Sequence, residues 1–165
     1  MSTPGPAAHT QWHDAMGHAL TEAQRALREH HTPNKESDVP IGAVVVDSQG
    51  RIIGRGHNQR EETHDPTAHA ELQAIRQAAS VIGDWRLAGC TLVVTLEPCA
   101  MCAGAILLAR IPRIVIGAWD PKAGATGSVW DIVRDPRMNH FTEVIADVRT
   151  TECAQLLTDF FTSRR

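Results

Sequence analysis

The chain has 165 residues, 42% of them hydrophobic and 21% charged, which is typical of a soluble globular protein. No apolar run approaches the roughly 20 residues needed to span a bilayer, and residues 1–10 lack the features of a secretory signal, so we expect a cytoplasmic protein that does not bind membranes. The formal net charge of −3 argues weakly against broad nucleic-acid binding, so any RNA contact must depend on a local patch.

The beginning of the chain predicts a tail followed by a domain that opens on a helix. Residues 1–11 are rich in Pro, Gly and Ala, which indicates a short disordered tail, and we expect a single domain over 12–165. Apolar residues recur at helical spacing from His13 to about His30 and predict an amphipathic helix. Pro33 ends this segment.

Strands and helices alternate along the rest of the chain, which predicts an α/β layered fold with a sheet that is at least partly parallel. A β-branched run, a turn and a return predict a hairpin over 41–57, and Pro66 opens a helix that Gly83 ends. The remaining expected elements are a buried strand over 91–96, a helix from Cys99 to about Ala109 that is apolar on several faces and buried between layers, a strand over 114–117, a polar loop over 119–128, a strand over 142–148 and a helix over 151–161.

Two of the four cysteines, Cys99 and Cys102, can share one face of the expected helix. A cytosolic chain keeps its thiols reduced, so a close pair of this kind is typical of a metal site or a catalytic site. Pro98 suits the first turn of a helix, where its missing N–H leaves no hydrogen bond unmade. Partial positive charge at the helix N-terminus favours thiolates, the form of cysteine that binds metal.

His69 adds a third ligand of a type that zinc accepts, and three protein ligands leave one tetrahedral position open, as in catalytic zinc sites. Water at such a position can reach a pKa of about 7, which supplies hydroxide at neutral pH. Glu71 would lie about 200° from His69 on a regular helix, so both serve one site only if that site lies off the helix start. Glu71 is then a candidate general acid and base.

Other interpretations of these residues stay open. A Cys-x-x-Cys pair also opens helices in redox proteins of the thioredoxin type, although this leaves the sequence His69-Ala70-Glu71 unexplained. A closed structural zinc site needs a fourth ligand, for which Cys90 is about a strand's length too far away but Cys153 stays open. Cys90 and Cys153 are otherwise expected to be small core residues.

A His-x-Glu motif followed by Pro-Cys-x-x-Cys is typical of zinc-dependent nucleobase deaminases. Further segments extend the likeness from about Trp12 to Arg165: Val39–Ala43, His64–Glu71, Thr95–Ala105, Asp120–Ala125, Met138–His140 and Leu156–Phe161. With these motifs the chain resembles the bacterial tRNA-specific adenosine deaminases.

This resemblance implies a three-layer cytidine-deaminase-like fold, with a central mixed five-stranded sheet flanked by helices, assembled as a homodimer with one zinc ion per subunit. It implies hydrolytic deamination of the wobble adenosine in a tRNA anticodon, expected to be that of an arginine tRNA, to inosine. Zinc-bound hydroxide would attack C6, and Glu71 would shuttle protons until ammonia leaves. The partner is then a tRNA anticodon stem-loop, which presents bases that are already unstacked.

Carried over by position, the resemblance makes His69, Cys99 and Cys102 the zinc ligands and Glu71 the catalytic acid and base. These four residues are the ones on which the chemistry depends.

The expected substrate contacts come from the resemblance as well. Asn58 looks like a residue that hydrogen-bonds the flipped nucleoside, although it could simply cap the turn before it. Asp120 and Lys122 look like loop contacts to the anticodon nucleotides, although both could be solvated surface charges. Trp119 and Thr126 differ from the family's commonest residues in this loop.

Phe160 and Phe161 are adjacent on the last expected helix and therefore point about 100° apart. We expect one of them in the core and the other as a stacking face in an RNA groove.

Two competing functions are considered. A free-base guanine deaminase of the same fold has a similar Pro-Cys-x-x-Cys helix, but the loop from Asp120 to Ser128 favours the tRNA enzyme. A non-catalytic zinc-containing RNA-binding module is the alternative from another class, and the intact Glu71 argues against it. The tRNA enzyme and the guanine deaminase are distinguished by whether activity requires RNA or accepts free guanine.

Overall fold

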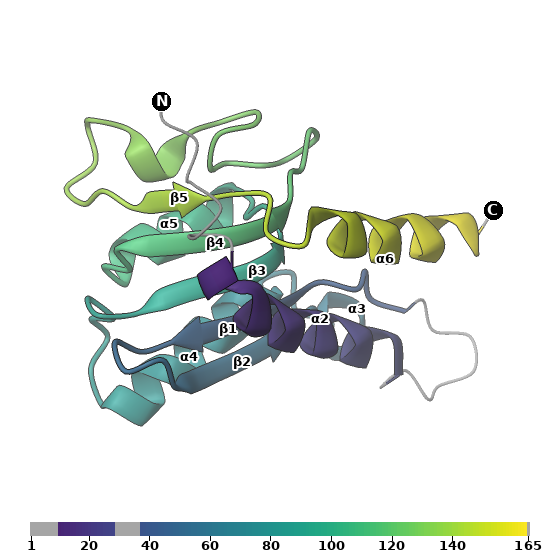
Figure 1. Cartoon of the computed structure of the whole chain (residues 1–165), viewed down its shortest axis with the longest axis horizontal. Helices are drawn as coiled ribbons and strands as arrows, with labels where there is room; N and C mark the ends of the chain where they lie inside the picture. The colour runs from purple at the N-terminus through teal and green to yellow at the C-terminus, as the bar shows by residue number, and fades with distance from the viewer. Residues whose placement is uncertain (1–9, 29–36, 165) are drawn as a thin grey trace.

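The computed structural model describes residues 10–28 and 37–164, and a five-stranded sheet lies at its centre (Figure 1). The strands are β1 (Gly42–Val46), β2 (Ile52–His57), β3 (Thr91–Leu96), β4 (Arg113–Ala118) and β5 (Glu143–Ile145). They lie in the order β2-β1-β3-β4-β5. Strand β1 is antiparallel to β2 and β3, whereas β3, β4 and β5 run parallel, so the sheet is mixed as expected.

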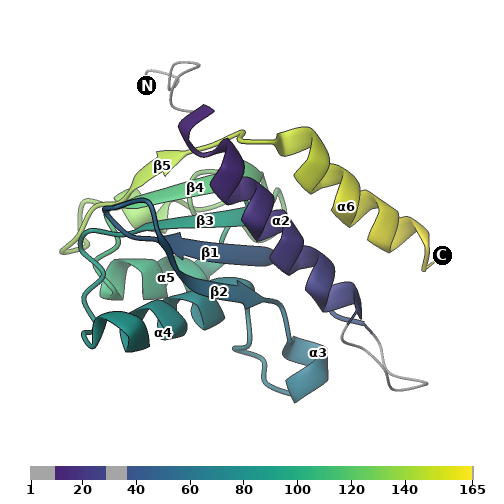
Figure 2. The same cartoon turned by 60° about the horizontal axis from the view of Figure 1, so that its bottom comes forward.

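Helices cover both faces of the sheet and produce three layers. They are α2 (His13–Arg28), α3 (Arg60–Thr63), α4 (Ala70–Ile82), α5 (Ala100–Leu108), a 3-10 helix (Ile132–Arg134) and α6 (Thr150–Thr162). Figure 2 shows α4 and α5 on one face and α2 and α6 on the other. Within the described residues, no helix combines the length and the apolar character that a membrane span requires.

Side chains of the central strands alternate between two hydrophobic clusters, one on each face of the sheet. Leu92 and Val94 of β3 pack in the cluster that includes residues of α4 and α5. Val93 packs in the opposite cluster with residues of α2 and α6. Cys90 belongs to the first cluster and Cys153 to the second, and both are buried, which confirms that they are core residues.

Helix α4 lies unusually close to β2, because glycine and alanine line their contact. A Cβ atom added at Gly54 would lie 2.2 Å from the backbone oxygen of Ala74, and one at Gly56 would lie 2.3 Å from that of Ala70. No side chain fits between the two elements at these positions. This close packing places the first turn of α4 beside the end of β2, where the candidate site lies.

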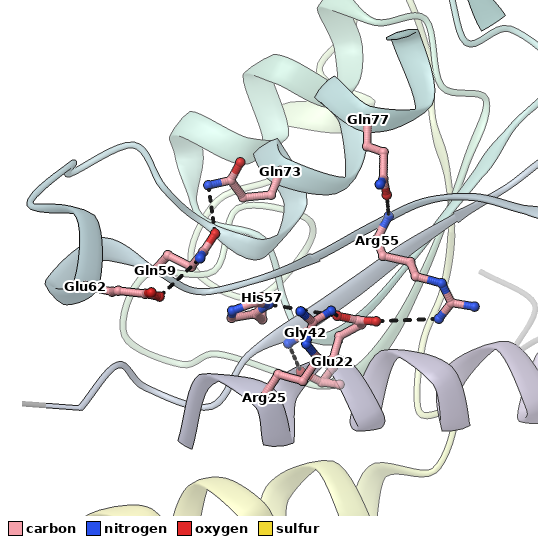
Figure 3. Close-up of polar contacts among 10 residues, drawn as sticks. Glu22, Arg25, Gly42, Arg55, His57, Gln59, Glu62, Gln73 and Gln77 are labelled. Carbon is pink, nitrogen blue, oxygen red and sulfur yellow. Dashed lines mark hydrogen bonds and ion pairs between the residues drawn. The ribbon is translucent and has the colours of Figure 1, made fainter. Parts of the chain in front are cut away.

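A buried carboxylate ties α2 to β2 (Figure 3). Glu22 is 4% exposed and lies 3.0 Å from Nη1 of Arg25, 3.5 Å from Nη1 of Arg55 and 3.9 Å from Nδ1 of His57. A buried charge is stable only when it is paired in this way. The cluster fixes α2 on the face of the sheet opposite α4.

Two element boundaries differ from the sequence predictions because of local turns. The helix expected from Pro66 begins at Ala70, because Oδ1 of Asp65 accepts hydrogen bonds from the N–H and hydroxyl of Thr67 and holds a turn there. The strand expected over 142–148 is only β5, and it does not reach Val148 because Asp147 adopts a positive φ of 65° that an extended strand does not allow.

Other predictions differ in burial or extent. Helix α5 is not buried all round, since Leu108 is 70% exposed and Met101 is 37% exposed. The short helix α3 and the 3-10 helix were not predicted, because three or four residues show no periodicity. Of the disordered tail predicted over 1–11, residues 1–9 lie outside the described residues, whereas Thr10 and Gln11 are helical, so the prediction is wrong for these two. His30 and Pro33, at the expected end of the first helix, also lie outside the described residues.

Candidate functional site

The starts of two helices meet beside the end of β3. His69 is the N-cap of α4 with an extended backbone (φ −79°, ψ 151°), and Cys99 is the N-cap of α5 with a similar backbone (φ −73°, ψ 175°). Because parallel β3 and β4 both end at this edge of the sheet, the connections that follow them converge here. The site therefore lies off the helix starts, as the positions of His69 and Glu71 required.

His69, Cys99 and Cys102 form a group that can hold a metal ion. Nδ1 of His69 lies 3.7 Å from Sγ of Cys99 and 3.6 Å from Sγ of Cys102, and all three donor atoms lie within 4.8 Å of one another. Nitrogen and sulfur ligands of a tetrahedral zinc ion lie about 3.6 Å apart, given Zn–N of about 2.1 Å and Zn–S of about 2.3 Å. The donor set and its spacing therefore fit zinc.

In residues 10–28 and 37–164, no fourth His, Cys, Asp or Glu joins this group. Cys153, the fourth ligand that the sequence left open, lies in the hydrophobic cluster on the other face of the sheet. The arrangement is that of a site with three protein ligands, which leaves a position for a reacting molecule.

Electrostatic coupling within the group favours a thiolate. Hydrogen bonds from Cys102 and His69 lower the pKa of the Cys99 thiol to about 4. The same hydrogen bond to Cys99, together with burial, raises the pKa of Cys102, and contact with Cys99 raises the pKa of His69. One negative sulfur at the start of α5 is suited to binding a cation.

Glu71 lies in the first turn of α4 and is 4% exposed. Burial disfavours the charged form and raises the pKa of its carboxyl to about 7, although the nearby His69 acts in the opposite direction. A carboxyl with a pKa near neutrality can both accept and donate a proton.

A cavity of about 440 Å³ opens onto these groups, within the size range of small-molecule sites. Its lining residues come from six regions of the chain: Val39, Ile41, Asn58, Arg60, His69, Ala70, Glu71, Leu96, Trp119, Asp120, Pro121, Lys122, Ala123, Leu157 and Phe161. The structure thus places Glu71 and His69, one member of the metal-binding group, in the same cavity as all three predicted substrate contacts.

Asn58 follows β2 and is 8% exposed. Its Nδ2 donates to the backbone oxygen of Val39 (3.2 Å), and its Oδ1 accepts from the backbone N–H of Arg60 (3.4 Å). The side chain therefore does not cap a turn before it, because Gly56 and His57 belong to β2; it joins the segment before β1 to the start of α3, and Asn58 also lines the cavity.

The loop after β4 supplies one wall of the cavity. Oδ1 of Asp120 accepts hydrogen bonds from the backbone N–H groups of Lys122 (2.9 Å) and Ala123 (3.3 Å), so this carboxylate shapes its own loop. Lys122 is exposed at the cavity. On α6, Phe160 is buried, which confirms that one of the two rings is in the core, and Phe161 is 53% exposed and lines the cavity. Stacking of Phe161 on RNA stays a prediction.

Sequence reasoning missed Glu97, which is only 2% exposed. Its carboxylate accepts hydrogen bonds from the backbone N–H groups of Asp120 (2.9 Å), Thr126 (3.0 Å) and Ser128 (3.1 Å). Burial alone would raise the pKa of Glu97, but these hydrogen bonds outweigh it and hold the pKa below its ordinary value. The available signal was a charged residue at the end of an otherwise apolar strand, immediately before Pro98.

Comparison with known proteins gives consistent matches. Residues 11–118 match the model of the cytidine and deoxycytidylate deaminase zinc-binding region. The chain is 44% identical over 142 residues to the tRNA-specific adenosine deaminase of Bacillus subtilis (strain 168), covering 86% of this chain and 88% of the relative.

Two solved structures are also similar. One comes from studies of A-to-I editing by tRNA:A34 deaminases at the wobble position of transfer RNA; it has a TM-score of 0.77, 44% identity and coverage of 86% of this chain and 97% of that chain. The other is guanine deaminase from Bacillus subtilis, with a TM-score of 0.58, 38% identity and coverage of 65% of this chain and 64% of that one.

Proposed function

We propose that this chain, which belongs to the cytidine and deoxycytidylate deaminase zinc-binding family and within it to the tRNA-specific adenosine deaminases, hydrolyses the wobble adenosine of a tRNA anticodon to inosine. The expected substrate is an arginine tRNA. One structural observation carries the proposal: Glu71 and His69 line the same cavity as Asn58, Asp120 and Lys122. A group suited to proton transfer therefore lies beside groups suited to holding a nucleoside.

The cofactor is zinc, one ion per subunit, and the proposed ligands are Nδ1 of His69 and the sulfur atoms of Cys99 and Cys102. The spacing of these three atoms supports this assignment. When bound, zinc lowers the pKa of water and so supplies a nucleophile at neutral pH. The N-cap and the first turn of α5 supply the two sulfur atoms, and hydrogen bonds from Cys102 and His69 lower the pKa of the Cys99 thiol, which favours one thiolate.

Glu71 carries the proton transfers. As the oxygen of water bonds to C6 of the adenine ring, Glu71 accepts a proton from that water and delivers it to N1. Glu71 then takes the second proton of the former water and gives it to the exocyclic nitrogen. The bond between C6 and that nitrogen breaks, ammonia leaves, and the oxygen remains as the carbonyl of inosine. Burial of Glu71 suits this alternation between charged and neutral forms.

Asn58, Asp120 and Lys122 are the proposed substrate contacts. The amide of Asn58 hydrogen-bonds the extruded nucleoside, and Asp120 and Lys122 contact the flanking nucleotides. An anticodon loop presents unstacked bases, so placing one in a cavity of about 440 Å³ requires little extra unstacking. The position of Lys122 at the rim supports a contact to phosphate.

A homodimer is proposed through the outer side of α5. Ala103, Ile106 and Leu107 of this helix are buried in the core of their own chain, so they are not available to a second copy. Met101 and Leu108 of the same helix remain exposed, and a second copy of the chain would cover them. Sedimentation analysis of wild-type protein and of Leu108→Glu tests this, and a monomeric wild type would overturn it.

The function is tested by incubating purified protein with an arginine tRNA that carries adenosine at the wobble position, and then assaying that position for inosine. Glu71→Ala serves as the control, because it should leave zinc bound. Inosine made only by the intact protein supports the proposal. Absence of inosine with zinc confirmed would overturn it. Guanine is then the next substrate, since a guanine deaminase shares the fold and 38% identity over part of the chain.

A further inference from the structure

Glu97 lies at the junction between β3 and α5, two residues before Cys99, with its carboxylate enclosed by the loop over 119–128. Oε2 accepts from the N–H of Asp120, and Oε1 accepts from the N–H groups of Thr126 and Ser128 and from the hydroxyl of Thr126 (3.3 Å). The three backbone donors span nine residues of the loop. A single side chain thus holds the beginning and the end of the loop.

The loop closes on this carboxylate so tightly that only glycine fits at its middle. A Cβ atom added at Gly124 would lie 2.1 Å from Oε2 of Glu97 and 2.2 Å from Oγ of Ser128. The neighbouring residue, Ala125, donates its N–H to the backbone oxygen of Pro98 (2.8 Å). The loop is therefore docked against the segment that leads into the metal-binding helix.

Residues 119–123 of this loop all line the cavity. The position of that wall depends on Glu97, because its carboxylate accepts the N–H of Asp120 inside the wall and the N–H of the fully buried Thr126 just beyond it. We propose that Glu97 is a positioning residue for substrate binding, holding the 119–128 loop in the conformation that forms the cavity wall. The part that concerns substrate rests on the proposed function, whereas the loop itself can be measured without any substrate.

The test compares Glu97→Gln with Glu22→Gln. In Glu97→Gln one carboxylate oxygen becomes an NH2 group, which faces a backbone N–H and cannot accept from it. Glu22→Gln makes the same chemical change at another buried carboxylate, in the α2–β2 cluster, and so controls for a general loss of stability. Gly124→Ala disturbs the docking from the side of the loop with Glu97 intact, and it serves as a second variant if Glu97→Gln does not fold.

Two measurements are made on each variant: amide hydrogen exchange of the free protein, and steady-state kinetics on an anticodon stem-loop. We expect faster exchange over 119–128 in Glu97→Gln and Gly124→Ala but not in Glu22→Gln. We also expect KM to rise roughly tenfold, the effect of losing a hydrogen bond to a charged group, with kcat changed much less and zinc retained.

Unchanged loop exchange in both loop variants would overturn the proposal, and so would faster exchange with an unchanged KM, which is the result of a purely structural role. Equal effects of Glu22→Gln would also overturn it. If the wild-type protein makes no inosine, the proposed function has failed. Hydrogen exchange alone then decides whether Glu97 holds the loop.

Discussion

His69 and Glu71 are two residues apart, and both side chains line one cavity although a regular helix would point them about 200° apart. The difference arises because His69 precedes α4 with an extended backbone, whereas Glu71 lies in the first helical turn. The turn at Asp65–Thr67 delays the helix start until Ala70. The proposed metal ligand and the proposed proton carrier thus reach the same cavity from positions two residues apart.

Replacing Glu71 with glutamine keeps the shape of the side chain but removes proton transfer. We expect kcat for inosine formation to fall by roughly 10²- to 10⁴-fold, the usual contribution of general acid–base catalysis. Zinc content, measured by elemental analysis, should stay at that of the wild type, because Glu71 is not in the metal-binding group. Near-normal turnover in the variant would show that another residue moves the protons.

Removing a metal ligand should unfold part of the chain as well as abolish activity. In Cys99→Ala we expect loss of zinc and a lower melting temperature, since ligand binding and folding are linked. Chelation of wild-type zinc should lower stability by about 4 kcal/mol where free zinc had exceeded its Kd about a thousandfold. Cys90→Ala is the matched control, because this buried thiol lies outside the group. Zinc retained in full by Cys99→Ala would contradict the ligand set.

Lys122→Ala should weaken RNA binding and flatten its dependence on salt. One lost phosphate contact lowers the slope of log affinity against log salt by roughly 0.7 to 0.9. Fluorescence anisotropy of a labelled stem-loop at several salt concentrations measures this slope. Arg86→Ala is the control, since Arg86 stacks on Trp85 beyond the end of α4 and does not line the cavity. A slope that does not change in Lys122→Ala excludes contact with phosphate.

Because α4 lies so close to β2, a glycine-to-alanine substitution should lower the free energy of unfolding far more at Gly54 than at Gly89. Gly54→Ala would place a Cβ atom 2.2 Å from the backbone oxygen of Ala74, so we expect a loss of about 1–3 kcal/mol of unfolding free energy. At Gly89 the nearest atom, Cβ of Ser48, lies 3.8 Å from the added Cβ, so Gly89→Ala should be close to neutral. Urea denaturation followed by circular dichroism measures both. If the two variants have equal free energies of unfolding, α4 can move away from β2 far enough to accommodate the added Cβ atom.

The residue types of the site were predictable from sequence because His-x-Glu and Pro-Cys-x-x-Cys are each short motifs, and their combination is typical of zinc-dependent nucleobase deaminases. His69, Cys99 and Cys102 could be named before their geometry was known, and the structure places their donor atoms within 4.8 Å of one another. The alternation of strands and helices likewise gave the layers of the fold. Local periodicity carries this information, since each element buries one face.

What could not be predicted depends on contacts between distant segments. The role of Glu97 depends on backbone N–H groups 23 to 31 residues later, which no local pattern reveals. The exposure of Leu108 depends on which side of α5 the sheet covers. The late start of α4 depends on one carboxylate, that of Asp65, accepting two hydrogen bonds from Thr67.

The matched variants Phe160→Ala and Phe161→Ala allow effects on stability to be separated from effects on substrate binding. Their rings meet edge to face with centroids 5.2 Å apart, but Phe160 is 6% exposed and Phe161 is 53% exposed. Phe160→Ala removes a buried ring, so we expect a loss of about 3 kcal/mol of unfolding free energy. Phe161→Ala should change stability little, because its ring is mostly in water.

For RNA affinity we expect the reverse: Phe161→Ala should bind RNA more weakly, and Phe160→Ala should not. Phe161 lines the cavity and offers a face to a base, and a lost stacking contact lowers affinity by roughly 5- to 100-fold. Affinity of Phe160→Ala, measured well below its melting temperature, should stay near that of the wild type. If Phe161→Ala binds the stem-loop normally, the exposed ring does not stack on RNA. If both variants lose affinity equally, the whole of α6, and not one ring, determines binding.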